Sequence, residues 1–324
     1  MQENSQDVLP HEIVDAFGRS FKTLRISVTN ACNLGCVYCV DGVSKNSSPV
    51  NASWEDLLEI VSALDEILDL ETIRLTGGEP TLYPHLVSLI NGMADMGIPI
   101  KMTTNGFLLS RLAKPLKEAG LKELNISLDA LDPIVFHKMA RHTGIEKVKE
   151  GIDNALTHAL HVKLNMVVVK GMNESQLLPL LEYAMERTIP IRFLELMRMG
   201  HLFSPHFKEQ FFPQSEILEM IRRYFPIKEV GKKKSATATY WEMENGYQFG
   251  IIANESSPFC QDCDRLRLDS DGNLFGCLSE NTPVPIRESI HDRTELVEKL
   301  KLALSHKQPG AFRGSGMTMI GIGG

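Results

Sequence analysis

Short β-branched runs alternate with longer amphipathic stretches over the first two thirds of the chain. Strands are predicted at 24–29, 72–76, 98–104, 124–129, 162–169 and 191–197. Helical spacing of apolar residues fills the gaps, as in residues 53–70, where Ser53 is the expected N-cap and Asp56 lies three residues on. Strand–helix alternation indicates parallel strands with right-handed crossovers. Because a complete TIM barrel needs eight such units, we expect an α/β fold with a partial, open TIM-type barrel of about six βα units.

The pattern changes after Met199, where an irregular stretch precedes a predicted helix at 213–225. Two hairpins are predicted beyond it, around Asn245-Gly246 and Asp271-Gly272, since such pairs favour tight two-residue turns. These elements predict a smaller α+β C-terminal domain. The expected organisation is an N-terminal extension at 1–20, the barrel at 21–200, and the C-terminal domain at 201–324.

Composition and charge narrow the possible partners. The chain has 324 residues, 43% hydrophobic and 23% charged, which is typical of a packed globular protein. A net charge of -7 argues against a nucleic-acid partner held by phosphate contacts, but leaves room for a local basic pocket for an anionic small molecule. No apolar run approaches the roughly 20 residues that span a bilayer, and the first twenty residues lack a secretory signal. We therefore expect a cytoplasmic protein with no membrane partner.

Two segments are given ordinary structural interpretations from composition alone. The lysine run Lys232 to Lys234 is expected to be a solvated loop. The glycine-rich end, residues 314–324, is typical of a frayed terminus.

Six cysteines form two groups of three. In a reducing cytosol they indicate metal ligands or catalytic thiols sooner than disulfides. Cys32, Cys36 and Cys39 follow the first predicted strand. Thiolates suit zinc, copper(I) and iron–sulfur clusters, but structural zinc usually takes four ligands, and Asp41 is a poor fourth. A [4Fe–4S] cubane held by three thiolates would keep one iron open for an exchangeable ligand.

This loop and a second motif resemble the radical S-adenosylmethionine (SAM) superfamily. Cys32-x3-Cys36-x2-Cys39 with Tyr38 matches its cluster signature, and the Gly77–Pro80 segment, GGEP, matches its second motif. The resemblance implies that the open iron chelates SAM, and that an electron from the cluster cleaves SAM to a 5′-deoxyadenosyl radical. It also implies that the GGEP backbone accepts the methionyl ammonium.

Polar residues recur at the carboxyl ends of the predicted strands, where βα barrels place their chemistry. Singly, each could be a helix cap or turn former, but one polar group per strand end favours a site. They are Glu79 after the second strand, Thr103, Thr104 and Asn105 at the third, Ser127 and Asp129 at the fourth, and Glu195 and Met197 at the sixth.

The second group is Cys260-x2-Cys263-x13-Cys277. Zinc with a fourth ligand from Asp262, Asp264 or Asp269 is one interpretation, since CxxC pairs are common in zinc sites. A second [4Fe–4S] cluster with an open iron is the other. Arg265 and Arg267 alternate on a predicted strand and would share one face, where paired guanidinium groups suit phosphate.

Residues 259–278, FCQDCDRLRLDSDGNLFGCL, resemble the C-terminal motif of the GTP 3′,8-cyclase family (molybdenum cofactor biosynthesis protein A), and the resemblance runs from about Phe21 to Gly324. That family converts GTP to (8S)-3′,8-cyclo-7,8-dihydroguanosine 5′-triphosphate, the first step of molybdenum cofactor biosynthesis. The resemblance implies SAM and two [4Fe–4S] clusters as cofactors, with the six cysteines as ligands. The implied cofactor-binding residues are Tyr38, Gly78, Glu79, Ser127 and Met197. The implied substrate-binding residues are Arg25, Arg74, Thr103, Lys163, Arg265, Leu266 and Arg267, and the implied catalytic residues are Arg25, Arg265, Arg267, Gly323 and Gly324.

The resemblance also implies a reaction and partners. The adenosyl radical removes the C3′ hydrogen of GTP, and the C3′ radical attacks C8 of the guanine. An external electron donor, a downstream cyclic pyranopterin synthase and a homodimer are implied as partners. Gly323-Gly324 resembles a tail that inserts into the active site, which replaces the frayed-terminus interpretation.

Two departures from the family pattern and two alternatives accompany this assignment. Val40-Asp41 stands where the family often has Met-Pro, and the tail reads MTMIGIGG where a single IGG is common. One alternative is a peptide-modifying radical SAM maturase, although those commonly carry more C-terminal cysteines. The other is a zinc-dependent regulatory module.

Overall fold

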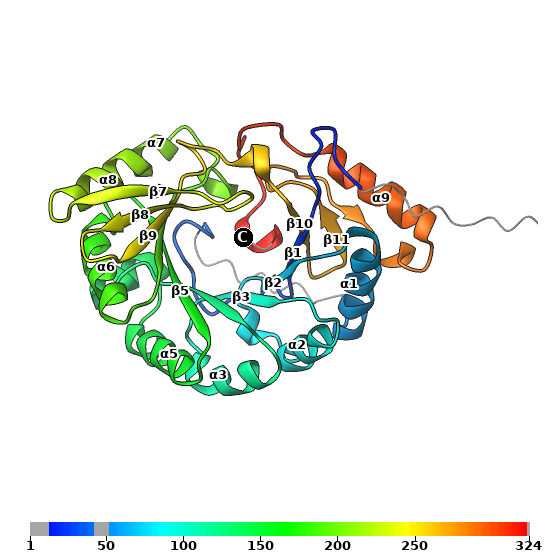
Figure 1. Cartoon of the computed structure of the whole chain (residues 1–324), viewed down its shortest axis with the longest axis horizontal. Helices are drawn as coiled ribbons and strands as arrows, with labels where there is room; N and C mark the ends of the chain where they lie inside the picture. Colours follow the sequence, from blue (N-terminus) through cyan, green and yellow to red (C-terminus); the bar gives the residue numbers. More distant parts are fainter. Residues whose placement is uncertain (1–12, 42–51, 323–324) are drawn as a thin grey trace, which may run out of the picture.

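One twelve-stranded sheet runs through the part of the chain that the computed structural model describes, residues 13–41 and 52–322 (Figure 1). Its strand order is β12-β11-β10-β1-β2-β3-β4-β5-β6-β9-β8-β7. The strands are β1 (Thr23–Ser27), β2 (Thr72–Thr76), β3 (Ile100–Thr104), β4 (Glu123–Ser127), β5 (His161–Val168), β6 (Ile191–Glu195), β7 (Ile227–Gly231), β8 (Thr239–Met243), β9 (Gln248–Ile252), β10 (Arg265–Leu268), β11 (Asn273–Phe275) and β12 (Val284–Pro285).

The sheet curls into an open barrel. β1 to β6 pair in parallel in chain order, and β10 and β9 continue the parallel pairing beyond β1 and β6. Antiparallel strands finish each edge, β11 and β12 beside β10, and β8 and β7 beside β9. Within the described residues these two outer edges are the ends of the strand order, so the sheet is not closed. The predicted partial barrel and both predicted hairpins are confirmed.

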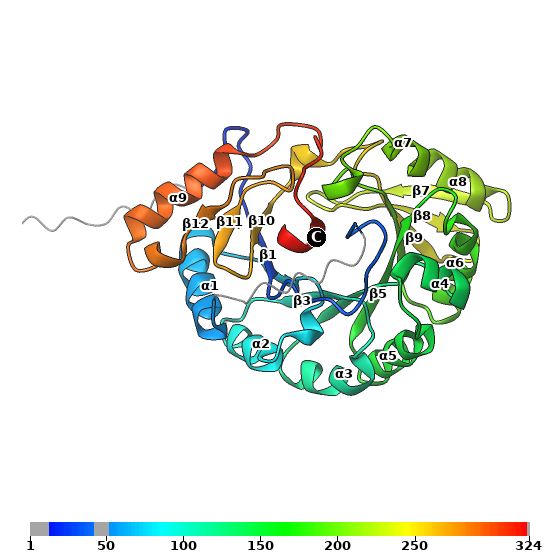
Figure 2. The ribbon, with the colours of Figure 1, turned by 180° about the vertical axis from the view of Figure 1, so that it is seen from behind.

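Helices cover the outside of the curled sheet (Figures 1 and 2). Ser53 caps the first of them as predicted, because its hydroxyl accepts the Asp56 N–H at 3.1 Å and the Asp56 carboxylate accepts the Ser53 N–H at 2.7 Å. The α-helices are α1 (Trp54–Leu68), α2 (Leu86–Ala94), α3 (Leu109–Glu118), α4 (Pro133–Ala140), α5 (Ile145–Thr157), α6 (Leu177–Glu186), α7 (Phe207–Gln210), α8 (Gln214–Arg222) and α9 (Arg293–Ser305). None of the helices in the described ranges is long and apolar enough to cross a membrane.

Alternation along each strand separates the core from the interior of the barrel. On β5, Val162, Leu164, Met166 and Val168 are buried in the core shared with the helices. The intervening Lys163, Asn165 and Val167 line the inside of the sheet. Successive side chains point to opposite faces of a strand, so one sequence period supplies both an apolar core and a polar interior.

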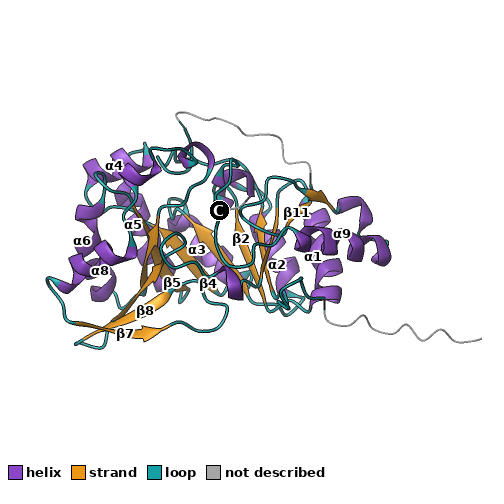
Figure 3. Cartoon of the chain, turned by 90° about the horizontal axis from the view of Figure 1, so that it is seen from above, coloured by secondary structure: helices purple, strands orange, loops and turns teal. Residues whose placement is uncertain are grey.

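Residues beyond 200 flank both edges of the parallel sheet. β7 to β9 extend the sheet beside β6, and β10 to β12 extend it beside β1. Figure 3 shows the β7–β8 ribbon and α9 at opposite ends of the molecule. The C-terminal part therefore contributes residues to both sides of the barrel interior.

Candidate functional site

All six cysteines line a single cavity of about 1040 Å³ inside the curled sheet. Small-molecule sites usually measure roughly 300–1000 Å³, so this cavity is at the upper end of the range of ligand sites. Eleven Lys and Arg residues but four Asp and Glu residues are among those that line it. The cavity is thus basic in a chain whose net charge is -7.

Backbone contacts shape the loop that carries Cys32, Cys36 and Cys39. The Gly35 and Val37 N–H groups donate to the last carbonyls of α4, each at 2.9 Å. Burial raises the pKa of Cys36 well above its usual value and that of Cys39 to about 12. Such thiols stay protonated unless a bound cation stabilises the thiolates. Three converging thiols with this need fit an iron–sulfur cluster.

The Gly77–Gly78 turn after β2 lies directly against this loop. The Gly78 N–H donates to the Thr29 carbonyl and the Glu79 N–H to the Ala31 carbonyl, both at 2.7 Å. A Cβ at Gly78 would lie 2.8 Å from the Ala31 carbonyl carbon and closer still to its oxygen. Only glycine therefore allows this turn and the cysteine loop to approach so closely.

Glu79 uses its carboxylate mainly to brace the site. It is 1% exposed and accepts the Thr81 and Thr104 hydroxyls at 2.5 and 2.6 Å and the Asn105 N–H at 2.7 Å. Burial raises its pKa, although these bonds oppose the shift. The Asn105 side chain continues the brace to Asn33 in the cysteine loop at 2.8 Å. Glu79 therefore joins the ends of β2 and β3 beneath the first cysteine group.

Tyr38 and Asp129 form a further connection from the same loop. The Tyr38 hydroxyl donates to Asp129 at 2.8 Å, and the same carboxylate accepts the Val167 N–H at 2.9 Å. Burial raises the pKa of Asp129 to about 6. This contact ties the cysteine loop to the ends of β4 and β5.

In the second cysteine group, Cys260 and Cys263 lie just before the start of β10, and Cys277 lies just after the end of β11. Burial raises the pKa of Cys263, but the charges of Arg265 and Lys307 outweigh it and lower the pKa to about 6. Lys307 Nζ lies 3.4 Å from Cys263 Sγ. This group therefore has cations beside it that stabilise a thiolate.

Neither cysteine group, as the described residues place it, forms a site for a single zinc ion. Thiolates on one tetrahedral zinc lie under about 4 Å apart, given Zn–S bonds near 2.3 Å. Within residues 13–41 and 52–322, no three His, Cys, Asp or Glu side chains are placed to hold a single metal ion. Asp269, one suggested fourth ligand, instead accepts the Asp271 and Asn273 N–H groups at 2.9 and 2.8 Å. A cubane takes each thiolate on a separate iron and so suits a wider set.

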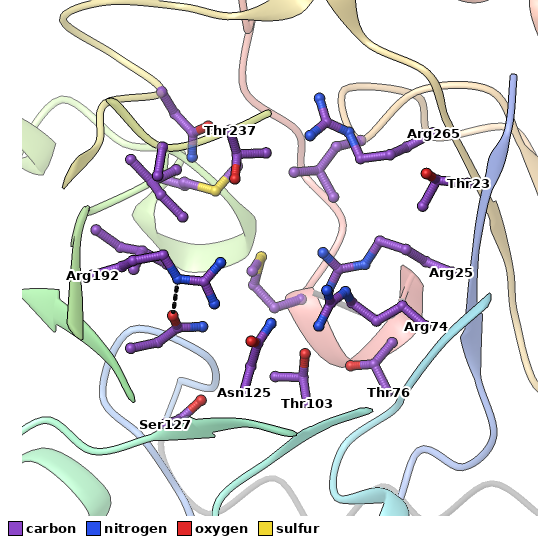
Figure 4. A pocket seen from close by; sticks show the side chains of 18 of the residues that line it. Thr23, Arg25, Arg74, Thr76, Thr103, Asn125, Ser127, Arg192, Thr237 and Arg265 are labelled. Carbon is purple, nitrogen blue, oxygen red and sulfur yellow. Dashed lines mark hydrogen bonds between the residues drawn. The ribbon is translucent and has the colours of Figure 1, made fainter. Parts of the chain in front are cut away.

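Strand register aligns a row of cations between the two cysteine groups. Arg267 pairs with Arg25, Arg25 with Arg74, and Arg74 with Lys101 across β10, β1, β2 and β3. Burial lowers the pKa of Arg25 well below its usual value, and the charges of Arg267 and Arg74 lower it further. Figure 4 shows Arg25 and Arg74 side by side, with Arg192 facing them. A row of half-buried like charges indicates an anionic ligand.

Orphaned polar atoms point to the same ligand. Arg74 Nη1, Arg192 Nη2 and Asn125 Oδ1 are buried without a hydrogen-bond partner among the described residues. Glu123 offsets part of the charge, because it pairs with Lys163 at 2.5 Å and with Arg74 at 3.3 Å. Buried polar groups are normally satisfied, so these atoms are suited to an incoming ligand.

The structure brings most of the predicted residues together and separates a few. Leu266 is the exception on β10: its side chain is fully buried in the core on the opposite face from its arginine neighbours. Its substrate contact stays a prediction, and the backbone is the part of Leu266 that would have to make it. Gly323 and Gly324 lie outside the described residues. The predicted residues that line the cavity are Arg25, Tyr38, Arg74, Gly78, Glu79, Thr103, Ser127, Lys163, Met197, Arg265 and Arg267.

The chain before this terminal pair is ordered into the barrel. The 3-10 helix η6 (Met319–Ile322) occupies its centre in Figure 1, where Met319 and Ile320 line the cavity. Ser315 holds its approach, because the Ser315 hydroxyl bonds Asn281 at 2.6 Å and the Ser315 carbonyl accepts the Gly200 N–H at 2.9 Å. The frayed-terminus interpretation is therefore wrong for this segment.

Sequence reasoning missed several cationic residues that line the cavity. Lys101 and Arg192 alternate with core residues inside predicted strands, which was the available signal. The lysine run Lys232 to Lys234 is an exposed loop as predicted, but the prediction missed that Lys232 and Lys233 also line the cavity. Lys307 carries no local pattern that could have revealed it.

Comparisons with known sequences match the two halves of the site. The Radical SAM superfamily model matches residues 26–184, and the Molybdenum Cofactor Synthesis C model matches residues 189–312. A GTP 3′,8-cyclase of Campylobacter fetus is 37% identical over 303 residues, 91% of this chain and 92% of the relative. A GTP 3′,8-cyclase of Helicobacter pylori is 38% identical over 296 residues, 89% of this chain and 90% of the relative.

Comparisons with solved structures support the fold alone, because their sequence identities are low. Streptococcus suis SuiB bound to S-adenosylmethionine aligns with a TM-score of 0.60 at 14% identity, covering 83% of this chain and 64% of that one. The protein anSMEcpe with bound AdoMet aligns with a TM-score of 0.60 at 16% identity, covering 87% of this chain and 83% of that one. With sequence relatives at 37–38% identity over most of its length, the chain belongs to the GTP 3′,8-cyclase family of the radical SAM superfamily.

Proposed function

We propose that this protein converts GTP to (8S)-3′,8-cyclo-7,8-dihydroguanosine 5′-triphosphate, the first step of molybdenum cofactor biosynthesis. The observation that carries the proposal is the arrangement of the cavity: two groups of three cysteines line it, with a row of cations on the strands between them. Relatives of that name match over most of the chain. A bound polyphosphate would neutralise this row of cations, whereas the arginines repel one another.

The residues around the first cysteine group fit a SAM site. Cys32, Cys36 and Cys39 would hold a [4Fe–4S] cluster, and the cluster with SAM supplies a 5′-deoxyadenosyl radical when bound. Gly78 sets the backbone against the cysteine loop, and Tyr38 fixes that loop to the end of β4. The residues proposed to contact SAM are Tyr38, Gly78, Glu79, Ser127 and Met197, with Glu79 acting through its backbone.

The cations and the second cysteine group fit a GTP site. Cys260, Cys263 and Cys277 would hold the second [4Fe–4S] cluster beside the base. Arg25, Arg265 and Arg267 are proposed to orient the nucleotide for reaction, since near-attack geometry supplies much of the rate. Gly323 and Gly324 are proposed to complete the site, and η6 brings the chain to within two residues of them. The remaining proposed GTP contacts are Arg74, Thr103, Lys163 and, from the structure, Lys101 and Arg192.

The proposal extends to partners and location. Reducing SAM requires an external electron donor, and a cyclic pyranopterin synthase would consume the product. All six cysteines are free, which suits the reducing conditions of the cytoplasm. A homodimer stays a prediction, to be measured by light scattering of the anaerobic protein.

Anaerobic purification followed by turnover tests the function. About eight irons per chain are expected, four for each cubane, and incubation with GTP, SAM and dithionite should yield the cyclised nucleotide by mass spectrometry. Arg265→Ala should abolish cyclisation or raise the GTP requirement while SAM cleavage stays measurable. Arg223→Ala, at an exposed arginine on the helix side, is the matched control. A colourless, zinc-only protein, or normal cyclisation by Arg265→Ala, would overturn the assignment.

A further inference from the structure

Lys307 places a buried ammonium group against the second cysteine group. The residue lies two positions beyond α9 and is 6% exposed. Its Nζ donates to Cys263 Sγ at 3.4 Å and to the Arg265 carbonyl oxygen at 2.6 Å. The same Nζ lies 4.5 Å from the ring centroid of the buried Phe21. The ammonium is thus enclosed by an aromatic ring, a carbonyl and a thiol.

The negative charge that offsets Lys307 comes from the cysteines. A buried ammonium is costly unless it is paired. Burial lowers the pKa of Lys307 and Arg265 lowers it further, whereas Cys263 and Cys277 oppose this shift without cancelling it. No carboxylate in the described ranges forms an ion pair with Lys307. The thiolates, and the cluster they would hold, are the counter-charge for this lysine.

Arg19, which is paired with Asp15, supports the backbone next to Lys307. Arg19 forms a buried pair with Asp15 at 2.5 Å. Its Nη1 donates to the carbonyl of Gln308 at 3.0 Å and also to the carbonyl of Cys260. Arg19 therefore fastens the residue after Lys307 to the loop of the second cysteine group. This connection fixes the backbone beside Lys307, and the contacts of its Nζ with Cys263 and Arg265 hold the side chain.

We propose that Lys307 raises the reduction potential of the second cluster, an inference that rests on the proposed function of the second cysteine group. One-electron reduction adds negative charge to a cluster already bound by three thiolates. A fixed ammonium that donates to a ligand sulfur stabilises this reduced state, because net charge and hydrogen bonds to sulfur set cluster potentials. Lys307 is thus a positioning and tuning residue, and it acts on GTP only through the cluster.

Potentiometric titration followed by EPR tests this in protein that carries only the second cluster. The background is the full chain with Cys32→Ala, Cys36→Ala and Cys39→Ala. Lys307→Met should lower the reduced-to-oxidised ratio at a set potential at least tenfold, equivalent to a midpoint 59 mV more negative for one electron. Lys307→Arg keeps the charge and should stay close to the parent. Lys301→Met, which removes an exposed lysine of α9, is the matched control.

The outcomes separate this inference from the proposed function. If the background protein binds no iron, the second cluster itself is refuted, whatever Lys307 does. If it binds about four irons and Lys307→Met has the midpoint of Lys301→Met, the inference about Lys307 is overturned. Should Lys307→Met fail to fold, Lys307→Gln and Lys307→Arg are compared instead. Equal midpoints for these two would overturn it as well, because they differ in charge but both keep an N–H donor.

Discussion

Replacing Gly78 with alanine should displace the loop that carries the first cysteine group. The added Cβ would lie 2.8 Å from the Ala31 carbonyl carbon and 2.9 Å from the Asn30 carbonyl oxygen. Ordinary contacts begin at 3.4 Å, so the separation from the Ala31 carbonyl carbon must open by about 0.6 Å, and the separation from the closer Ala31 oxygen must open by more. Both obstacles are backbone and cannot rotate aside as a side chain would. The displacement passes directly into the loop, whose Cys32 follows Ala31.

A shift of this size should lower SAM affinity more than it lowers the stability of the fold. Functional groups must stay within about 0.5 Å of their working geometry, and overpacking typically costs about 1–3 kcal/mol. If that strain is relieved by moving the cysteine loop, SAM affinity should fall about 5- to 150-fold. The hydrogen bonds from Gly78 and Glu79 to this loop would lengthen with it.

Iron content, SAM binding and 5′-deoxyadenosine release, measured anaerobically, would check this prediction. Gly35→Ala is the matched control, because it lies in the same loop and its Cβ would meet only Arg141 side-chain atoms at 3.6 Å. Gly78→Ala should lose SAM binding and cleavage, whereas Gly35→Ala should keep its iron. Wild-type SAM affinity in Gly78→Ala would refute the reasoning, since the turn and loop would then have room that the structure denies them.

Three further predictions concern other parts of the cavity. Arg192→Met should weaken GTP binding about 10- to 150-fold by equilibrium dialysis, the loss of about 1.5–3 kcal/mol for a charged hydrogen bond, whereas exposed Arg223→Met should not. Burial raises the pKa of Asp15, but the contacts with Arg19 outweigh burial, and the net pKa lies below its usual value of 3.8. The ionised Asp15 carboxylate therefore stabilises the fold above pH 3.8, and this stabilisation is lost as the pH falls through the lowered pKa. Asp15→Asn should therefore flatten the loss of stability in urea unfolding between about pH 5 and 3; an unchanged slope would contradict this. Ser315→Ala should lower turnover about two- to tenfold with unchanged iron, and unaltered turnover would show that this anchor does not hold the tail.

Local sequence patterns were sufficient to predict the repeated strand–helix units and the two cysteine motifs. Short β-branched runs located β1 to β6, and the spacing of the cysteines located both metal-binding loops. The alternation of side chains along β10 turns the Leu266 side chain away from the cavity, because Arg265 and Arg267 cannot share one face unless the residue between them takes the other. The substrate contact predicted for Leu266, which was carried over from a family segment, would therefore have to be made by its backbone.

Contacts between segments far apart in the sequence could not be predicted, because they depend on how distant strands and loops pair. Lys232 lies over the cavity because β7 and β8 join the sheet beyond β9, an arrangement that no local pattern specifies. Lys307 meets Cys263 only because the segment after α9 folds back across β10. Glu123 became a partner of Arg74 through the register of β2, β3 and β4. Each of these contacts depends on tertiary structure and not on a motif.

The pairing of β1 with β10 has a consequence for synthesis of the protein. β1 contains residues 23 to 27, and its second neighbour, β10, begins at Arg265. While the chain is growing, that side of β1 is an open strand edge for more than two hundred residues, a hazard for mispairing. The wall that joins the first cysteine loop to the second is complete only when β10 has been made. Chains that end before β10 therefore lack this wall, and chemistry that must be shielded from water is confined to molecules translated at least as far as Leu268.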